Sequence, residues 1–379
     1  MTPEDRSRIL LSPPVVTRSD IDAVVAAMSS GWLAPVGPDL QAFEEEIAQA
    51  VGVSHAVGLS SGTAAIHLGL KYMGVRPGDC VLVPTVTFGA TAFAVTYLGA
   101  EPVFIDVDES WNMDPALVGG AISSLRASGR RVSAAIPVDL YGTLANYPAL
   151  IPILAEAEVP LLEDAAEAVG TTCSGGNAGS FGQAGVLSFN GNKLITTSGG
   201  GMLVTDDDEL ARKVRFWATQ SREDVPWYEH EEIGYNYRLS NILAALGRSQ
   251  LRRVAAEVAK RRQIREWYRD RLETREGVLV QSDPRWGGSN AWLSVVRFDP
   301  LIHPGTSTRV RRLLDSHKVE SRPVWKPLHL QPVFAGATSF LTGSAEQLFR
   351  DGLCLPSGTA MMEEDVDRVS NIVLEALQV

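Results

Sequence analysis

Short apolar runs alternate with helix-like segments through the first half of the chain. The runs are continuous rather than alternating in polarity, which is typical of strands buried on both faces. Strands separated by helices predict a mostly parallel sheet with its loops gathered along one edge. Polar residues at the C-terminal ends of such strands are candidates for a binding site. The predicted strands are residues 56–59, 80–84, 102–107, 134–140 and 160–163.

Helical periodicity marks both flanks of this region. An Ala/Val-rich run predicts a helix over residues 17–28, with Ser19 and Asp22 as its capping box. The Gly- and Pro-rich residues 31–38 end that helix in a rigid loop. Beyond Arg238, apolar residues recur at helical spacing and predict one long connecting helix. Those residues are Leu243, Leu246, Leu251, Val254 and Val258.

The C-terminal part has its own mixed pattern. It predicts a strand at residues 292–298, a helix at 307–317 and a terminal helix at 363–377. A chain of 379 residues is too long for one ordinary core. We therefore expect an α/β protein with a large domain over residues 1–245, followed by a connector helix and a smaller α/β domain over 246–379.

Composition narrows the class of protein. A hydrophobic content of 45% and a charged content of 21% are those of an ordinary globular protein, and the net charge of -11 disfavours nucleic-acid binding. The three cysteines (Cys80, Cys173 and Cys354) lie far apart without metal-ligand spacing, which indicates a reducing compartment and no disulfide framework. The histidines show no metal-ligand grouping either.

The chain also lacks the patterns of export and membrane insertion. Residues Met1 to Asp5 show no basic region followed by an apolar stretch, and no run of about 18 apolar residues occurs. We expect a soluble, cytoplasmic protein with no membrane, nucleic-acid or metal partner.

One lysine is set in a Gly- and hydroxyl-rich stretch. Lys193 ends the run 188–193, Ser-Phe-Asn-Gly-Asn-Lys, and three glycines follow at 199–201. In a desolvated site a lysine amine forms a Schiff base with an aldehyde. Most lysines are solvated surface charges, so this hypothesis needs support from other segments. Ser188 and Asn190 of the same run join Lys193 as candidate cofactor-binding residues.

A strand-to-helix turn offers a place for a phosphate. Gly62, Thr63 and Ala64 open the helical pattern that follows the first predicted strand. Backbone N–H groups at a helix N-terminus bind anions, and the helix dipole adds to the attraction. The alternative is an ordinary N-cap by Ser or Thr, and on this segment alone it is the favoured interpretation.

Three further residues suit a planar, cationic heterocycle. Asp164 directly follows an apolar strand, where a buried carboxylate needs a cationic partner such as a pyridinium nitrogen. Phe88 is placed to stack on a ring, although a phenylalanine is usually core. Glu167 is placed to reach a ring hydroxyl or to be an exposed first-turn residue. Capping of the next helix explains Asp164 equally well at this stage.

Asn236 and Arg238 precede the connecting helix, which Ser240 or Asn241 is expected to cap. Both are candidate donors to anionic groups. An internal ion pair explains Arg238 about as well as a contact with a pyrophosphate.

Together these segments resemble the DegT-type sugar aminotransferases, which are pyridoxal phosphate enzymes with the aspartate aminotransferase fold. The resemblance covers nearly the whole chain and implies fold type I, with a large domain built on a mostly parallel mixed sheet and a smaller C-terminal α/β domain. It is carried, in order, by residues 32–38, 60–65, 87–91, 163–167, 188–193, 234–241, 325–334 and 355–358.

The resemblance assigns a role to each candidate. It implies that Lys193 forms the Schiff base with pyridoxal 5'-phosphate and that Asp164 pairs with the pyridine nitrogen. Phe88 is implied to stack on the ring, and Glu167 to lie near the ring hydroxyl. The residues implied to bind the phosphate are Gly62, Thr63, Ala64 and Ser188. Asn236 matches a residue that reaches the phosphate of the opposite subunit, so a homodimer with shared active sites is implied.

Within the family, the chain is most similar to the bacillosamine-type branch. That similarity implies transfer of an amino group from L-glutamate to C4 of a UDP-linked 4-keto-6-deoxy-N-acetylhexosamine, with pyridoxamine 5'-phosphate as the intermediate form of the cofactor. Candidate contacts to the sugar nucleotide are Trp32, Tyr141, Arg238, Trp325 and His329. For His329 and Trp325, ordinary packing is the more common role.

Several alternatives stay open at this stage. They include aminotransfer to a 3-keto sugar or to a dTDP- or GDP-linked sugar, and a regulatory or scaffold protein that binds the cofactor without chemistry. Sugar 3-dehydratases of this family carry His in place of the lysine, and Lys193 disfavours them. Residues 60–65 lack the Gly-x-Gly-x-x-Gly turn of a nicotinamide enzyme. Asp139 stands where relatives commonly have His, and the sequence offers no reason for it.

Overall fold

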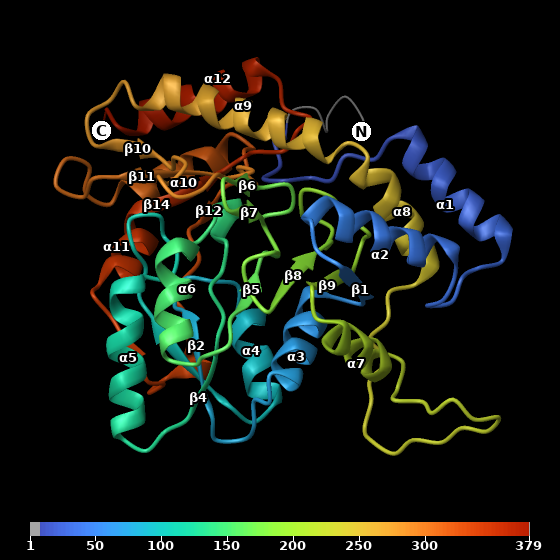
Figure 1. Ribbon diagram of the computed structural model, residues 1–379. Coiled ribbons are helices and arrows are strands. Elements are labelled where there is room, and N and C mark those ends of the chain that lie inside the picture. The colour runs from blue at the N-terminus through green and yellow to red at the C-terminus, as the bar shows by residue number, and fades with distance from the viewer. Residues whose placement is uncertain (1–7, 379) are drawn as a thin grey trace.

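The computed structural model describes residues 8–378 (Figure 1). Residues Met1 to Asp5, on which the expectation of no export signal depends, lie outside the described residues. Over residues 8–378, none of the helices has the length and apolarity that a membrane crossing needs.

A central sheet is built from two four-stranded sheets that meet where β4 adjoins β5. Their strand orders are β1-β9-β8-β5 and β13-β3-β2-β4. Parallel bridges from Ala135 to Leu161 and from Val138 to Asp164 join the two sheets. The strands are β1 (His55–Leu59), β2 (Cys80–Pro84), β3 (Glu101–Ile105), β4 (Val132–Ala135), β5 (Leu162–Asp164), β8 (Ala184–Ser188), β9 (Gly201–Thr205) and β13 (Ser339–Phe340).

Strand pairing is parallel except at β9. This strand is antiparallel to both β1 and β8, whereas β2, β3 and β4 pair in parallel, as do β5 and β8. The predicted mostly parallel mixed sheet is confirmed. Because β1, β5 and β8 run in one direction, their C-terminal ends meet at the same edge, where a ligand site is expected.

Two helical layers cover the faces of the central sheet (Figure 1). Val81 and Val83 pack into the cluster that holds α3, α4 and α7, whereas Leu82 packs into the cluster that holds α2, α5 and α6. Burial on both faces explains the continuous apolar runs of the strands. The helices are α2 (Pro38–Val51), α3 (Gly62–Tyr72), α4 (Gly89–Tyr97), α5 (Pro115–Ala127), α6 (Tyr147–Glu156) and α7 (Asp208–Ala218).

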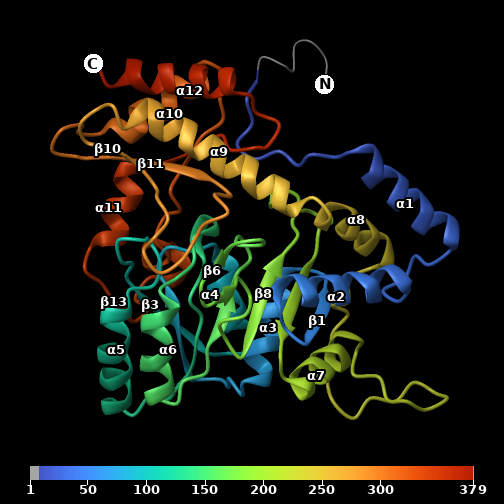
Figure 2. The ribbon, with the colours of Figure 1, turned by 45° about the horizontal axis from the view of Figure 1, so that its top comes forward.

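The C-terminal part forms a second, antiparallel sheet in the order β10-β11-β14-β12. Helices α9, α10 and α12 share one core cluster with it, and Figure 2 shows α9 and α12 side by side. Its elements are β10 (Val278–Val280), β11 (Ser294–Phe298), α10 (Thr306–Ser316), β12 (Arg322–Pro323), α11 (Ser344–Asp351), β14 (Gly352–Leu355) and α12 (Glu363–Ala376).

Short elements complete the connections. Strand β13 comes from the C-terminal part yet pairs with β3, so residues beyond 246 also extend the central sheet. The division at residue 245 stays a prediction. The remaining elements are the hairpin of β6 (Thr172–Cys173) and β7 (Gly176–Asn177) and the 3-10 turns η2 (Leu140–Gly142), η3 (Leu328–Leu330) and η4 (Pro332–Phe334).

The predicted single connecting helix is wrong, because it is two helices. α8 (Asn241–Leu251) is capped by the Ser240 side chain, and α9 (Val254–Leu272) begins after a break at Arg253. The backbone of Arg253 is non-helical, with φ -114° and ψ 8°. Apolar residues recur at helical spacing on both sides of the break, so periodicity alone does not reveal it.

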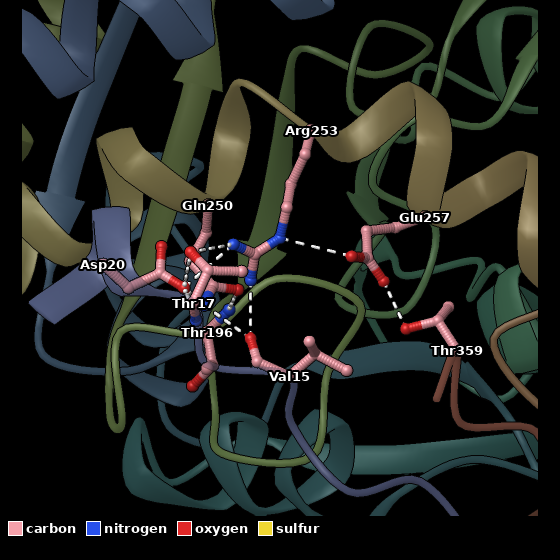
Figure 3. A network of polar contacts seen from close by, with 8 residues as sticks. All are labelled: Val15, Thr17, Asp20, Thr196, Gln250, Arg253, Glu257 and Thr359. Atoms are coloured by element: carbon pink, nitrogen blue, oxygen red, sulfur yellow. Dashed lines mark hydrogen bonds and ion pairs between the residues drawn. The ribbon is translucent and has the colours of Figure 1, made fainter. Parts of the chain in front are cut away.

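The break at Arg253 places its guanidinium in a polar network (Figure 3). Nη1 donates to Asp20 Oδ2 at 2.8 Å, and Nη2 donates to the Val15 carbonyl at 2.5 Å. Nε donates to Glu257 at 3.2 Å, and Glu257 accepts from the Thr359 hydroxyl. The guanidinium thereby ties the N-terminal segment to α9 and to the loop before α12.

The same network corrects the predicted capping box of α1 (Arg18–Ser30). The box uses Thr17 and Asp20 rather than Ser19 and Asp22. Asp20 is buried, and its Oδ2 accepts from the Thr17 N–H at 2.8 Å. Asp22 instead pairs with Arg18 on the surface. The helix begins at Arg18, two residues earlier than it would with Ser19 as its N-cap, so Asp22 falls outside the capping position.

Replacing Asp20 by Ala should lower the free energy of unfolding by about 2 to 3 kcal/mol, because the change leaves the Arg253 guanidinium without its buried partner. Asp22→Ala, on the exposed face of the same helix, is the matched control and should cost less than about 0.5 kcal/mol. Denaturant unfolding measures both, and equal losses would contradict the importance of the network.

The environment of the Asp20 carboxyl predicts that the stability of the protein depends on pH in the acid range. Burial opposes its ionisation, but hydrogen bonds from Thr17, Ser249 and Arg253 outweigh burial and lower its pKa. A carboxyl whose pKa is lowered by folding stabilises the folded protein at pH values above its unfolded-state pKa of about 4. This stabilisation is lost as the pH falls below that value. The stability gap between wild type and Asp20→Ala should therefore narrow below about pH 4.

Candidate active site

A cavity of about 580 Å³ opens at the shared C-terminal edge of β1, β5 and β8, against the C-terminal part of the chain. Its walls also include residues 10–13 of the N-terminal segment. Nine residues singled out from the sequence line it: Gly62, Thr63, Phe88, Asp164, Glu167, Ser188, Asn190, Lys193 and Trp325. The fold thus brings together segments that lie up to 263 residues apart, from Gly62 to Trp325.

Lys193 points its ammonium at two partners inside this cavity. Nζ lies 3.0 Å from Glu167 Oε1 and 4.2 Å from the centroid of the Trp292 ring. The Trp292 indole N–H donates to the Asn192 carbonyl at 2.8 Å, which fixes the ring. Only 13% of the lysine side chain is exposed. This lysine is therefore not a solvated surface charge.

Glu167 is buried and aimed at Lys193, so the alternative of an exposed first-turn residue is wrong. Its second oxygen, Oε2, accepts the Tyr141 N–H at 2.8 Å. Tyr141 adopts the left-handed region, with φ 55°, which an L-residue occupies only when the surroundings enforce it. Burial raises the pKa of the Glu167 carboxyl, and the charge of Lys193 opposes the rise.

Asp164 has neutral hydrogen-bond partners. The Thr91 hydroxyl donates to Oδ2 at 2.8 Å, and the Ala166 N–H donates to Oδ1 at 3.2 Å. Burial raises the pKa of Asp164, and these donors together with the charge of Lys193 offset the rise only in part. A buried carboxylate without a cation in direct contact suits a protonated ring nitrogen. The residues that follow Asp164 form turns rather than a helix, so the alternative that Asp164 caps the next helix is wrong.

The N-terminus of α3 forms the predicted anion cradle, with one change. Ser61 caps the helix and accepts the Ala64 N–H at 3.1 Å, so that amide already has a partner. The Gly62 and Thr63 N–H groups have none among residues 8–378 and face the cavity with Ser188. A Cβ at Gly201 would lie 2.4 Å from the Gly62 nitrogen, so the cradle requires glycine there. These donors fit a phosphate.

Phe88 stands at the mouth of the cavity rather than in the core. Its side chain is 63% exposed and its ring lies 5.7 Å from that of Trp325. Trp325 in turn contacts Tyr141, whose ring lies 5.2 Å away and whose hydroxyl accepts the Trp325 N–H. An exposed ring beside Asp164 and the cradle is suited to stacking on a planar ligand. Cradle, carboxylate, ring and lysine therefore fit pyridoxal phosphate.

Other predicted residues lie outside the wall of this cavity. Asn236 is exposed and holds the Gln220 amide at 3.0 Å, and Trp32 is about half exposed with its carbonyl bonded to Asn241. Tyr141 is fully buried behind Trp325.

Arg238 and His329 are engaged within the chain. The Arg238 guanidinium pairs with Glu44 at 2.6 Å, as the ion-pair alternative predicted. His329 is held between the Thr85 hydroxyl, at 2.6 Å from Nδ1, and the Glu346 carboxylate, at 3.3 Å from Nε2. In this chain neither side chain lines the cavity with Lys193.

Two residues of the site were not identified from the sequence. Thr91 lay within a segment of interest, yet only the fold shows that its hydroxyl meets Asp164, 73 residues away. Trp292 was taken as the start of a strand that in fact begins at Ser294. No local pattern places its ring under Lys193, because that contact depends on how the C-terminal part packs against the cavity.

Asp139 and Glu163 form a second acidic pair directly behind Asp164. The Asp139 Oδ1 accepts from the Ala145 N–H and the Tyr147 hydroxyl, and its N–H donates to the Asp164 carbonyl. Its Oδ2 has no donor among the described residues other than the neighbouring Glu163 carboxyl group.

A shared proton satisfies this pair. Both Glu163 oxygens accept backbone N–H groups, so only a proton held between the two carboxyls pairs Asp139 Oδ2. Burial, with a smaller contribution from the charge of Asp164, raises the pKa of Asp139 to about 7, although hydrogen bonds from Ala145, Tyr147 and Glu163 oppose the rise. Burial and the Asp139 charge raise the pKa of Glu163 well above its ordinary range. Asp139 therefore acts as one half of a protonated buried pair.

This pair predicts a pH dependence of stability. An acid whose pKa rises on folding destabilises the folded state progressively as the pH climbs from about 4, its unfolded value, to about 7. Asp139→Asn offers Glu163 an amide N–H in place of the shared proton and removes the Asp139 charge that raises the Glu163 pKa, so the variant should take up less of a proton than the pair does. Wild type should therefore lose stability relative to this variant between pH 4 and 7, by at most about 1.4 kcal/mol per pH unit.

Denaturant midpoints measured from pH 4 to 8 test this slope. Asp270→Asn, which changes an exposed carboxylate on α9, is the control. Its denaturant midpoint should change with pH in parallel with that of wild type. A wild-type profile parallel to that of Asp139→Asn would show that the pair holds no proton.

Comparison with known proteins agrees with this site. The profile of the DegT/DnrJ/EryC1/StrS aminotransferase family matches residues 14–374. The "Putative pyridoxal phosphate-dependent aminotransferase EpsN" of Bacillus subtilis is 43% identical over 372 residues, which are 97% of this chain and 95% of EpsN. A GDP-perosamine synthase of Caulobacter vibrioides is 36% identical, over 96% of this chain and 97% of that protein.

A solved structure extends the agreement to the fold. The aminotransferase TlmJ of Streptoalloteichus hindustanus superposes with a TM-score of 0.90 at 30% sequence identity, over 98% of this chain and 99% of TlmJ. The predicted fold type I, the aminotransferase class and pyridoxal phosphate as cofactor are confirmed. The chain belongs to the DegT/DnrJ/EryC1/StrS aminotransferase family.

Proposed function

We propose that this enzyme transfers the amino group of L-glutamate to a nucleotide-linked keto-deoxy sugar, at C4 of a UDP-linked 4-keto-6-deoxy-N-acetylhexosamine. The observation that carries the proposal is the placement of Lys193 Nζ, 3.0 Å from Glu167 in the cavity that also exposes Asp164 and the first amides of α3. The choice of sugar rests on the resemblance of residues 32–38, 189–193 and 326–332 to the bacillosamine-type branch.

Bound pyridoxal phosphate supplies an aldehyde that takes up the amino group and a ring that accepts the electrons released at the substrate carbon. Lys193 Nζ would hold the cofactor through that aldehyde, and its free amine would move a proton at the substrate carbon. Glu167 Oε1 keeps Nζ directed into the cavity. Asp164 would pair with the ring nitrogen, and Gly62, Thr63 and Ser188 would hold the phosphate.

The protein is proposed to act as a homodimer with shared sites. Asn236, expected to reach the neighbouring phosphate, is bridged to Thr219 at the base of the loop that projects from the body after α7 (Figures 1 and 2). Helix α1 also exposes an apolar stripe at helical spacing, which is typical of an association surface. Its members are Ile21, Val25 and Met28, each between 47% and 58% exposed, and Trp32, 48% exposed, follows just beyond the end of the helix.

A GDP-linked sugar is the second candidate substrate. The 36% identity to a protein named GDP-perosamine synthase favours it. An assay with L-glutamate and a panel of UDP-, dTDP- and GDP-linked 3-keto and 4-keto sugars separates the candidates, with the amino product identified by NMR. Amination restricted to a 3-keto sugar would overturn the C4 assignment.

Lys193→Ala should abolish turnover, by roughly 1,000-fold or more, because the variant has no amine to hold the cofactor or move the proton. After borohydride treatment of the cofactor-loaded protein, mass spectrometry should find the label on the Lys193 peptide of wild type only. Lys260→Ala is the matched control, since Lys260 also lies over a tryptophan ring, that of Trp267 at 4.4 Å, away from the cavity.

The same labelling distinguishes an enzyme from a cofactor-binding protein without chemistry. A wild-type protein that carries the label but never converts its cofactor with any amino donor would support the binding-protein alternative. Substantial multiple turnover by Lys193→Ala would refute the role of this lysine.

Mixing two inactive variants tests the shared site. Asn236→Ala and Lys193→Ala chains should each be inactive or impaired alone, yet their mixed dimers contain one complete site if Asn236 acts across the interface. Activity should therefore reappear after the two are unfolded and refolded together. If the refolded mixture is no more active than the two variants measured separately, Asn236 does not contribute to the active site of the partner subunit.

A further inference from the structure

The charges on the cavity wall leave one cation without an assigned role. The ionisable lining residues are Asp164, Glu167, Lys193, Glu320 and Arg322. The chemistry proposed above occupies Lys193, which is already paired with Glu167. Three carboxylates on the wall repel an anionic ligand, so a dicarboxylate requires a positive charge to enter. Arg322 is the remaining cation among the described lining residues.

Arg322 is held loosely and faces the cavity from an edge strand. It lies on β12, where it pairs with Cys354, another lining residue. Its Nη2 contacts Glu320 Oε1 at 2.9 Å, and 67% of its side chain is exposed. An exposed ion pair of this kind contributes little to stability, so the guanidinium is free to exchange partners at small cost.

The partner of Arg322 is itself anchored. Glu320 Oε2 accepts the Leu11 N–H at 3.1 Å, which fixes the carboxylate against the N-terminal wall of the cavity. Nε and Nη1 of Arg322 donate to no residue within 8–378. One nitrogen of the guanidinium is therefore hydrogen-bonded, and its other N–H donors are available. Such a guanidinium can bind a carboxylate through two parallel hydrogen bonds.

We propose that Arg322 binds a carboxylate group of the amino donor. The inference rests on the proposed function. Glutamate carries its α-carboxylate on the carbon that bears the reacting amine, so a carboxylate must enter the cavity with Lys193. The diphosphate of a sugar nucleotide is attached at C1, across the sugar ring from a reacting C4. Arg322 therefore serves the donor and its keto-acid product rather than the nucleotide.

Calorimetric titration of the cofactor-loaded protein tests this assignment. The probes are 2-oxoglutarate, UDP and GDP, and the variants are Arg322→Ala and Arg322→Lys. Arg322→Ala should weaken 2-oxoglutarate binding roughly 10- to 100-fold, the loss expected for a charged hydrogen-bonded contact, and leave nucleotide binding within about twofold. Arg322→Lys should recover part of the loss, because it restores the charge without the planar fork.

Arg312→Ala is the matched control, because Arg312 is exposed on α10 in the same part of the chain and does not line the cavity. It should bind all three probes as wild type does. A KM for glutamate that rises in Arg322→Ala with little change in kcat supports a binding role. Unchanged 2-oxoglutarate affinity, or a loss confined to UDP and GDP, would overturn the proposal.

Failure of the proposed function has a different outcome. A wild-type protein whose bound cofactor is not converted by glutamate refutes the aminotransfer itself. The 2-oxoglutarate titration still decides the role of Arg322 in that case, because it needs no turnover.

Discussion

The site depends on an excess of buried carboxyl groups around a single ammonium. Asp139, Glu163, Asp164 and Glu167 are all buried near the end of β5, and Lys193 contacts only Glu167 among them. Unpaired charges are costly in such a place, so each carboxyl needs its own means of neutralisation. Glu167 has the ammonium, and Asp139 and Glu163 share a proton. Asp164 has only a hydroxyl and an amide, which leaves it suited to a cationic ring.

The fold supplies the positions for this arrangement. The bridge from Val138 to Asp164 brings the end of β5 beside the chain that leaves β4, so the acidic pair lies behind Asp164. Strands β1 and β8 end at the same edge and add the amides of α3 and the hydroxyl of Ser188. The C-terminal part closes the cavity with Trp292 and Trp325, and the Arg253 network ties that part to the N-terminal segment. The candidate site residues and the strand ends that position them therefore lie at the same edge of the sheet.

Much of this was predictable, because buried strands and helix termini leave local patterns. The strands around the site, the N-terminus of α3, and Lys193, Asp164 and Phe88 follow from continuous apolar runs and the polar residues that end them. Contacts between distant segments leave no such pattern. Trp292 beneath Lys193 and Thr91 on Asp164 depend on tertiary packing. The break at Arg253 also leaves no local pattern, and the contacts of its side chain with Val15 and Asp20 join segments more than 230 residues apart.

The central claim is that Asp164 keeps the cofactor's ring nitrogen protonated. The most direct measurement is the ¹⁵N NMR shift of the ring nitrogen of labelled pyridoxal phosphate bound to wild type and to Asp164→Asn. The account predicts a protonated nitrogen in wild type at pH 8 and an unprotonated one in the variant. The same protonation state in both proteins would contradict it.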